Sequence, residues 1–164
     1  MKIVWPSALM LGMLAASPIC ATGQWYGGAE ALTGIEHIGL AGVFVTWDDR
    51  ISQKTEEQFE REVRDAFELG VRRFGIVIDE AREPIGRSVW CTVVMIYDNG
   101  LVSYSQEVDY REFLMRAQPR SLREAKLWGT TSVVTVGAAR LDGAHAGEDC
   151  AESFELAWRR SNPE

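Results

Sequence analysis

The stretch "VWCTVVMIYDNGLVSYSQEV", residues 89–108, decides the fold that this sequence predicts. Two runs rich in β-branched and aromatic residues, which favour strands, stand on either side of Asn99-Gly100. Both residues of that pair tolerate positive φ, so the pair favours a two-residue hairpin turn. The sequence therefore predicts a β-hairpin at the centre of the molecule.

The alternation of side chains along this hairpin assigns them to two faces. With Asn99-Gly100 as the loop, the facing pairs on the mostly apolar face are Tyr97–Val102, Met95–Tyr104, Val93–Gln106 and Cys91–Val108. The other face is mixed, and holds Trp90, Thr92, Val94 and Ile96 against Ser103, Ser105, Glu107 and Asp109. A slip of one residue would exchange the two faces, so the pattern sets the register. We expect the second hairpin strand to run to about Leu114.

Three further strands are expected on either side of the hairpin. They cover residues 40–47 ("LAGVFVTW"), 74–79 ("FGIVID") and 127–137 ("LWGTTSVVTVG"). A loop rich in glycine is expected over residues 137–147.

Two amphipathic helices are expected between and after these strands. The first begins at Thr55, where Thr55 and Gln58 form a capping box, and Gly70 is placed where a C-terminal cap belongs. The second covers residues 148–160. Each has one apolar stripe, which must be buried. The pattern predicts an α+β fold with a single mixed β-sheet of four to five strands, a central Asn-Gly hairpin, and two helices packed on one face.

The beginning of the chain, "MKIVWPSALMLGMLAASPICATG", has the order of a secretory signal peptide: a basic residue, an apolar stretch, then small residues. We expect cleavage after Ala21. A lipoprotein with Cys20 lipidated is the alternative, although Ile19 stands where a small residue is wanted. The expected organisation is a signal peptide over 1–21, a flexible lead-in over 22–38, and one α/β domain over 39–164. The protein would then be periplasmic or secreted, with no integral membrane segment after cleavage.

The chain is acidic, with 17 basic and 24 acidic side chains and a formal net charge of −7. This charge disfavours nucleic acid as a partner, because nucleic acids are polyanions. The sequence contains no P-loop, no dinucleotide-binding fingerprint and no nucleophile elbow. We therefore expect no cofactor and identify no catalytic residue.

Cys91 and Cys150 remain after removal of the leader. Export would place them in an oxidising compartment, where disulfides persist. Cys91 belongs to the apolar hairpin face and Cys150 to the apolar stripe of the last helix. We therefore expect a disulfide bond between them; the alternative is two buried free thiols.

Four acids follow two of the expected strands: Asp48, Asp49, Asp79 and Glu80. If those strands are parallel neighbours, the four side chains would gather at one edge. Such a group would suit a hard cation such as calcium, or an acid with a raised pKa for hydrolysis. The plainer interpretation is that these are turn-forming residues, and we assign no metal site.

The expected binding surface is the mixed face of the hairpin, with Trp90, Val94 and Ile96, together with Trp47 at the end of a strand. Exposed tryptophans mark binding surfaces because they bury a large area at low entropic cost.

The order of elements, from the leader through the hairpin and "LWGTTSVVTVG" to a last helix that ends at Asn162-Pro163, resembles small exported bacterial proteins of unknown function. It is also similar to small periplasmic accessory domains of cell-envelope machines. The resemblance implies an exported α/β protein and no activity.

These observations favour a non-enzymatic exported protein that binds another cell-envelope or secreted protein through an exposed sheet face or edge. One alternative is a small hydrolase or metal-assisted enzyme that uses the clustered carboxylates. Another is a periplasmic inhibitor or immunity protein.

Overall fold

The structure is a computed structural model that describes residues 21–22, 27–79, 86–116 and 121–163. The expected signal peptide, except for Ala21, lies outside the described residues, and so does Glu80 of the acidic group.

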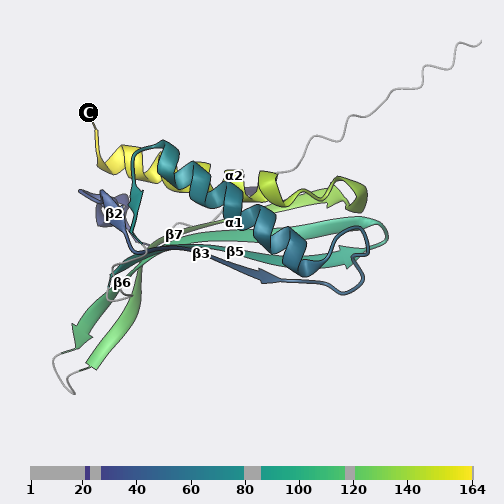
Figure 1. Ribbon diagram of the computed structural model, residues 1–164, viewed down its shortest axis with the longest axis horizontal. Coiled ribbons are helices and arrows are strands. Elements are labelled where there is room, and N and C mark those ends of the chain that lie inside the picture. The colour runs from purple at the N-terminus through teal and green to yellow at the C-terminus, as the bar shows by residue number, and fades with distance from the viewer. Residues whose placement is uncertain (1–20, 23–26, 80–85, 117–120, 164) are drawn as a thin grey trace, which may run out of the picture.

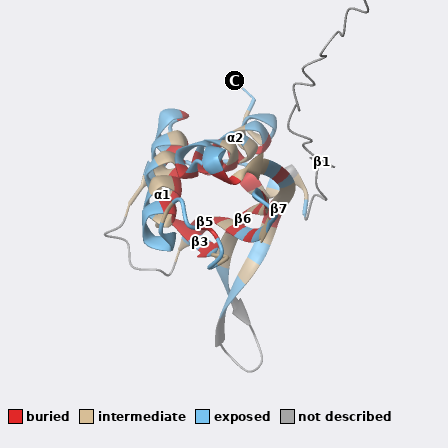
Figure 2. Ribbon diagram, turned by 90° about the vertical axis from the view of Figure 1, so that its right-hand side faces the viewer, coloured by how far each residue is buried: buried red, intermediate tan, exposed pale blue. Residues whose placement is uncertain are grey.

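The central feature is a mixed β-sheet with strand order β1-β7-β6-β5-β3 (Figure 1). Its strands are β1 Ala21–Thr22, β3 Leu40–Thr46, β5 Arg87–Asp98, β6 Leu101–Arg116 and β7 Ser121–Gly137. Strand β3 runs parallel to β5, and the other neighbours are antiparallel. The helices α1 Glu56–Arg73 and α2 Gly143–Ser161 cover one face of this sheet (Figure 2). The predicted α+β fold is therefore confirmed.

The hairpin has the predicted register. Tyr97 lies opposite Val102, and Cys91 lies opposite Val108. Asn99 and Gly100 form the turn with φ of 48° and 82°, the left-handed conformation that the dipeptide favours. The second strand continues to Arg116, slightly past its expected end.

A second, small sheet was not predicted. It pairs β2 His37–Ile38 with β4 Val77–Ile78 in parallel. The prediction that residues 74–79 add a strand to a single sheet is wrong, because β3 takes β5 as its parallel neighbour. The expected lead-in also contributes to the core. The 3-10 helix η1 Ala29–Leu32 precedes β2, and the side chains of Leu32, Ile35 and Ile38 are buried.

The start of α1 agrees with the prediction, since the Thr55 hydroxyl accepts a hydrogen bond from the Gln58 N–H at 3.2 Å. The predicted end at Gly70 is wrong, because the helix continues to Arg73. The predicted start of the last helix is also wrong: a short 3-10 helix, η2 Ala138–Arg140, is followed by α2 from Gly143. Asp142 caps that helix by accepting a hydrogen bond from the Ala144 N–H at 3.0 Å.

Glycines explain these two differences, because they let α1 and α2 pack backbone against backbone. A Cβ at Gly147 would lie 2.3 Å from the Val63 carbonyl oxygen, and a Cβ at Gly143 would lie 2.8 Å from that of Phe59. On the other helix, a Cβ at Gly70 would lie 2.3 Å from the Ala151 Cβ. No side chain fits at these positions, so glycine here serves close packing instead of ending a helix.

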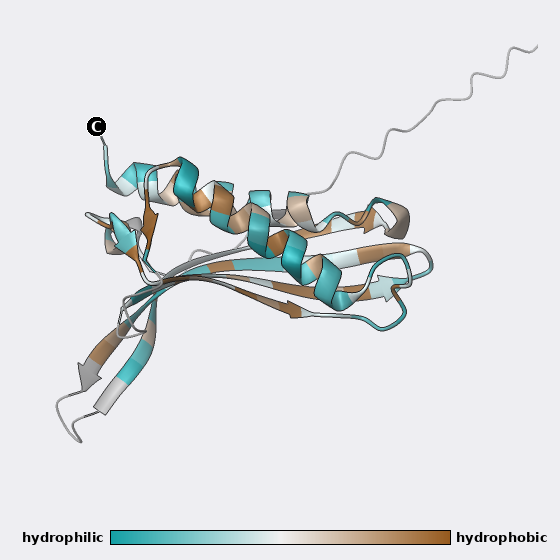
Figure 3. Ribbon diagram, in the orientation of Figure 1, coloured by the Kyte–Doolittle hydropathy of each residue, from teal (hydrophilic) through white to brown (hydrophobic). Residues whose placement is uncertain are grey.

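The β6–β7 hairpin extends beyond the rest of the sheet as a two-stranded ribbon, which projects at the lower left of Figure 1. Its pairing shifts by one residue at Tyr110/Arg111, and Glu112 is the last residue of β6 that pairs with β5. Phe113 and Leu114 are exposed on this ribbon, and both apolar and polar segments of it are visible in Figure 3. No helix in the described part of the chain is long and apolar enough to cross a membrane.

Candidate functional site

The face of the sheet that points away from α1 and α2, called the outer face here, carries side chains from the long strands β3, β5, β6 and β7. Alternation along β3 and β5 sends every second residue to this face, and the buried residues between them point to the helices. Neither helix covers the outer face (Figure 2). It is therefore the part of the sheet that is open to a partner.

Three apolar side chains form an exposed group on the outer face, which we call the outer patch: Phe44, Val94 and Ile96. Phe44 is 57% exposed and Ile96 is 62% exposed, which is high for large apolar side chains on a sheet. In the register, Phe44 lies opposite Thr92, so it is a diagonal neighbour of Val94. Val94 and Ile96 were predicted. Phe44 was not, although the alternation in "LAGVFVT" places it, like Leu40, on the outer face.

Trp90 lies on the outer face as predicted, but it is packed in place rather than free. A Cβ at Gly42 would lie 2.5 Å from the Trp90 ring, so the indole covers that glycine. Its Nε1 donates a hydrogen bond to the Ser88 hydroxyl at 3.1 Å. The Arg111 guanidinium carbon lies over the Trp90 ring, 5.3 Å from its centroid, in a cation–π contact. Trp90 thus forms the border of the outer patch.

The buried carboxylate of Asp109 fixes the Arg111 side chain that lies over Trp90. The Asp109 side chain is 1% exposed and pairs with the Arg111 guanidinium through both of its oxygens, one of them at 2.9 Å. Lys126 Nζ lies 3.7 Å from Asp109 Oδ2 and also contacts Glu107. The hydrogen bonds that Arg111 donates to Asp109 raise the pKa of Arg111. The pairing keeps Arg111 charged and in place over Trp90.

Trp47 lies elsewhere. Its ring packs at a centroid distance of 5.6 Å from Phe59 of α1, and it is partly buried against the core. The structure therefore does not bring Trp47 together with Trp90, Val94 and Ile96.

Neighbouring strands do not bring Asp48 and Asp49 together with Asp79, because β3 and β4 belong to different sheets. Asp48 accepts hydrogen bonds from the Arg50 side chain and from the Tyr97 N–H, at 2.7 Å and 2.8 Å. These contacts hold the pKa of Asp48 well below its usual range. Asp79 follows β4, and its N–H donates to the Ile38 carbonyl at 2.9 Å. Among the residues that the structure describes, no three His, Cys, Asp or Glu side chains lie close enough to hold a metal ion.

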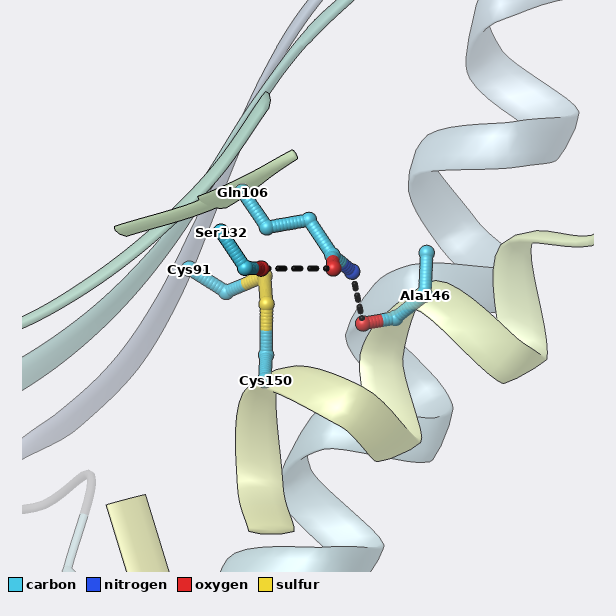
Figure 4. The surroundings of a disulfide bond; sticks show 5 residues. All are labelled: Cys91, Gln106, Ser132, Ala146 and Cys150. Atoms are coloured by element: carbon cyan, nitrogen blue, oxygen red, sulfur yellow. Dashed lines mark hydrogen bonds between the residues drawn. A yellow bond between two sulfur atoms is a disulfide. The ribbon is translucent and has the colours of Figure 1, made fainter. Parts of the chain in front are cut away.

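The Cys91–Cys150 disulfide is present, as predicted, with a Cα–Cα distance of 6.0 Å. It ties α2 to the helix-facing side of β5 (Figure 4). The buried Gln106 lies beside it, and its Nε2 donates to the Ala146 carbonyl at 2.8 Å while its Oε1 accepts from Ser132 at 3.3 Å. Helix α2 is therefore fixed to β5 and β6 on the side of the sheet opposite the outer patch.

No family model and no curated protein matches this chain. Among solved structures, the chain aligns with a protein described as a PelC dodecamer from Paraburkholderia phytofirmans. The alignment covers 90% of this chain and 100% of that chain, with 9% sequence identity and a TM-score of 0.41. A likeness at this level of identity and TM-score carries no functional information about this chain.

Proposed function

We propose that this chain is an exported, non-enzymatic domain that binds another protein of the cell envelope through the outer patch. The observation that carries the proposal is the contrast between the two faces of the sheet. Both helices cover one face, whereas the other keeps Phe44 and Ile96 more than half exposed. Clustered exposed apolar side chains with a polar border are typical of protein-binding surfaces.

Two observations support export. The leader sequence has the order of a signal peptide, and the buried Cys91–Cys150 bond belongs to a compartment where disulfides persist. The net charge of −7 favours a protein over a nucleic acid as the partner.

The residues on the patch suit this role because the backbone beneath them is held firmly. Thr46 and Val94 are paired in register, and α2 is fixed to β5 by the disulfide. A rigid apolar surface loses little conformational entropy when a partner covers it. The exposed Phe44 and Ile96 side chains are the expected anchors.

The test is site-specific photo-crosslinking of the exported protein in its native envelope, with a photoreactive residue in place of Ile96. The crosslinked protein is identified by mass spectrometry, and its affinity for the purified chain is then measured for the wild type and for Phe44→Asp and Ile96→Asp. A charge placed in the buried part of an interface is expected to weaken binding by at least about thirtyfold.

Leu69→Asp is the matched control, because Leu69 is 51% exposed but belongs to α1 on the other side of the molecule. It should leave the affinity unchanged. Equal affinity of the wild type and Ile96→Asp would contradict the proposal.

A further inference from the structure

A pocket lies between α2 and the end of the sheet formed by β6 and β7, on the side opposite the outer patch. Its volume is about 180 Å³. It is lined by Gln106, Ser132, Val134, Asp149, Glu152, Ser153 and Leu156. The apolar part of the lining is contributed by Val134 and Leu156.

The polar groups of this pocket are suited to a cation. Its two charged lining residues, Asp149 and Glu152, are both acidic. Gln106 is 2% exposed, and its amide is oriented by the Ala146 carbonyl and the Ser132 hydroxyl.

The surroundings of Asp149 leave its charge poorly compensated. Burial raises the pKa of Asp149, and the neighbouring Glu148 and Glu152 raise it further. His145 acts in the opposite direction and lowers the pKa of Asp149. Its Nε2 lies 3.8 Å from Asp149 Oδ2, on the exposed surface of α2. A positively charged group in the pocket would supply the missing counter-charge.

Strand β1 lies at the edge of the sheet next to this pocket. Thr22 is paired with Ser132, and Ala21 with Val133. Ser132 is itself part of the pocket lining. Paired residues on neighbouring strands have their Cα atoms roughly 4.5–5.5 Å apart, so the backbone of Thr22 lies beside a residue of the pocket lining.

Cleavage of the leader after Ala21 would change the charge at this position. Hydrolysis adds water across the Ala21–Thr22 amide bond, which leaves a carboxylate on Ala21 and an ammonium group on Thr22 at neutral pH. In the uncut precursor the same nitrogen is an uncharged amide. Processing therefore creates a cation beside the acidic pocket.

We infer that this pocket binds the α-ammonium group of Thr22 in the processed chain, with the Asp149 carboxylate as its principal counter-ion and Gln106 Oε1 as a further acceptor. The inference rests on the export and cleavage assumed in the proposed function. It gives signal-peptide removal a structural consequence, because only the cut creates the ammonium group that the acidic pocket binds.

The first test is the N-terminal residue of the exported protein, measured by mass spectrometry. Thr22 is expected. A chain that begins at a lipidated Cys20, or at any residue other than Thr22, would overturn the inference while leaving partner binding at Ile96 unaffected.

The second test compares chains that begin at Thr22 with a free or an acetylated amine, in the wild type and in Asp149→Asn. Acetylation is expected to lower the melting temperature of the wild type by about 2–4 °C and to have no effect in Asp149→Asn. Glu155→Gln, further along α2, is the matched control and should keep the full effect of acetylation.

A third measurement does not depend on stability. The acid dissociation constant of the ¹⁵N-labelled Thr22 amine, followed by NMR, should be about tenfold lower than that of an ordinary α-amino group. An ordinary constant, or an acetylation effect that persists in Asp149→Asn, would show that the pocket does not hold the terminus. If a lysine-containing peptide binds the pocket of a chain whose Thr22 amine is free, the pocket serves a partner's side chain instead. That result would also overturn the inference.

Discussion

Removal of the Cys91–Cys150 bond should destabilise this protein by an amount that can be worked out from the chain. The two cysteines are 59 residues apart, and both side chains are buried. Closing a loop of this length restricts the unfolded chain, which corresponds to about 4 kcal/mol in the chain-entropy model. The proposed change is the double variant Cys91→Ala/Cys150→Ala, which removes the bond without leaving a polar group in the core.

The expected effect on thermal unfolding is large. For a domain of this size, each kcal/mol corresponds to a change of about 2–4 °C in the melting temperature, so the double variant should melt roughly 8–16 °C below the oxidised wild type. Circular dichroism follows the transition. The reduced wild type serves as the comparison, because it loses the bond but keeps both sulfur atoms.

Two results would refute this reasoning. A double variant that melts within about 2 °C of the oxidised wild type would show that the bond does not restrict the unfolded chain as assumed. A reduced wild type that keeps the melting temperature of the oxidised protein, while the double variant loses stability, would assign the effect to packing of the sulfur atoms instead.

Two further predictions concern the helix contact and a carboxylate. Gly147→Ala would stabilise an isolated helix by about 1 kcal/mol. Here the new Cβ would lie 2.3 Å from the Val63 carbonyl oxygen, so denaturant unfolding should show a free energy of unfolding about 1–3 kcal/mol lower than that of the wild type. The control is Gly137→Ala, which has open space around it and should change the free energy of unfolding little. The lowered pKa of Asp48, caused first by the Arg50 side chain, means that its carboxylate stabilises the fold fully above about pH 4 and loses this effect as the pH falls toward the folded-state pKa. Asp48→Asn should therefore melt below the wild type at pH 7, with a gap that narrows below about pH 4; a constant gap would contradict the assignment.

The hairpin could be predicted residue by residue because its information is local. Asn99-Gly100 selects the turn, and a period-two pattern then determines which residues face each other. The disulfide followed from the same reasoning, since Cys91 and Cys150 were assigned independently to an apolar face and an apolar stripe.

The predicted ends of the two helices were wrong for a reason that is not local. Gly143 and Gly147 have the lowest helix propensity apart from proline, so a local interpretation places them in a loop. The contact with α1 overrides that propensity, because only glycine lets the two backbones approach. Such a contact joins residues that are far apart in the sequence, for example Gly147 and Val63. A pattern of neighbouring residues therefore cannot predict it.

The candidate binding surface could be predicted only in part. Val94 and Ile96 followed from the hairpin register, and Phe44 could have been found from the alternation in its own strand. The packed state of Trp90 could not, because it depends on Gly42 from one neighbouring strand and Arg111 from the other.

The projecting β6–β7 ribbon divides the molecule into two parts of unequal stability. Beyond Glu112, no third strand among the described residues lies beside it and neither helix lies over it, and a lone pair of strands is only marginally stable in water. Its backbone hydrogen bonds can therefore break while those around Cys91 remain intact. A protease that cuts this ribbon would consequently leave a body that is still closed by its disulfide.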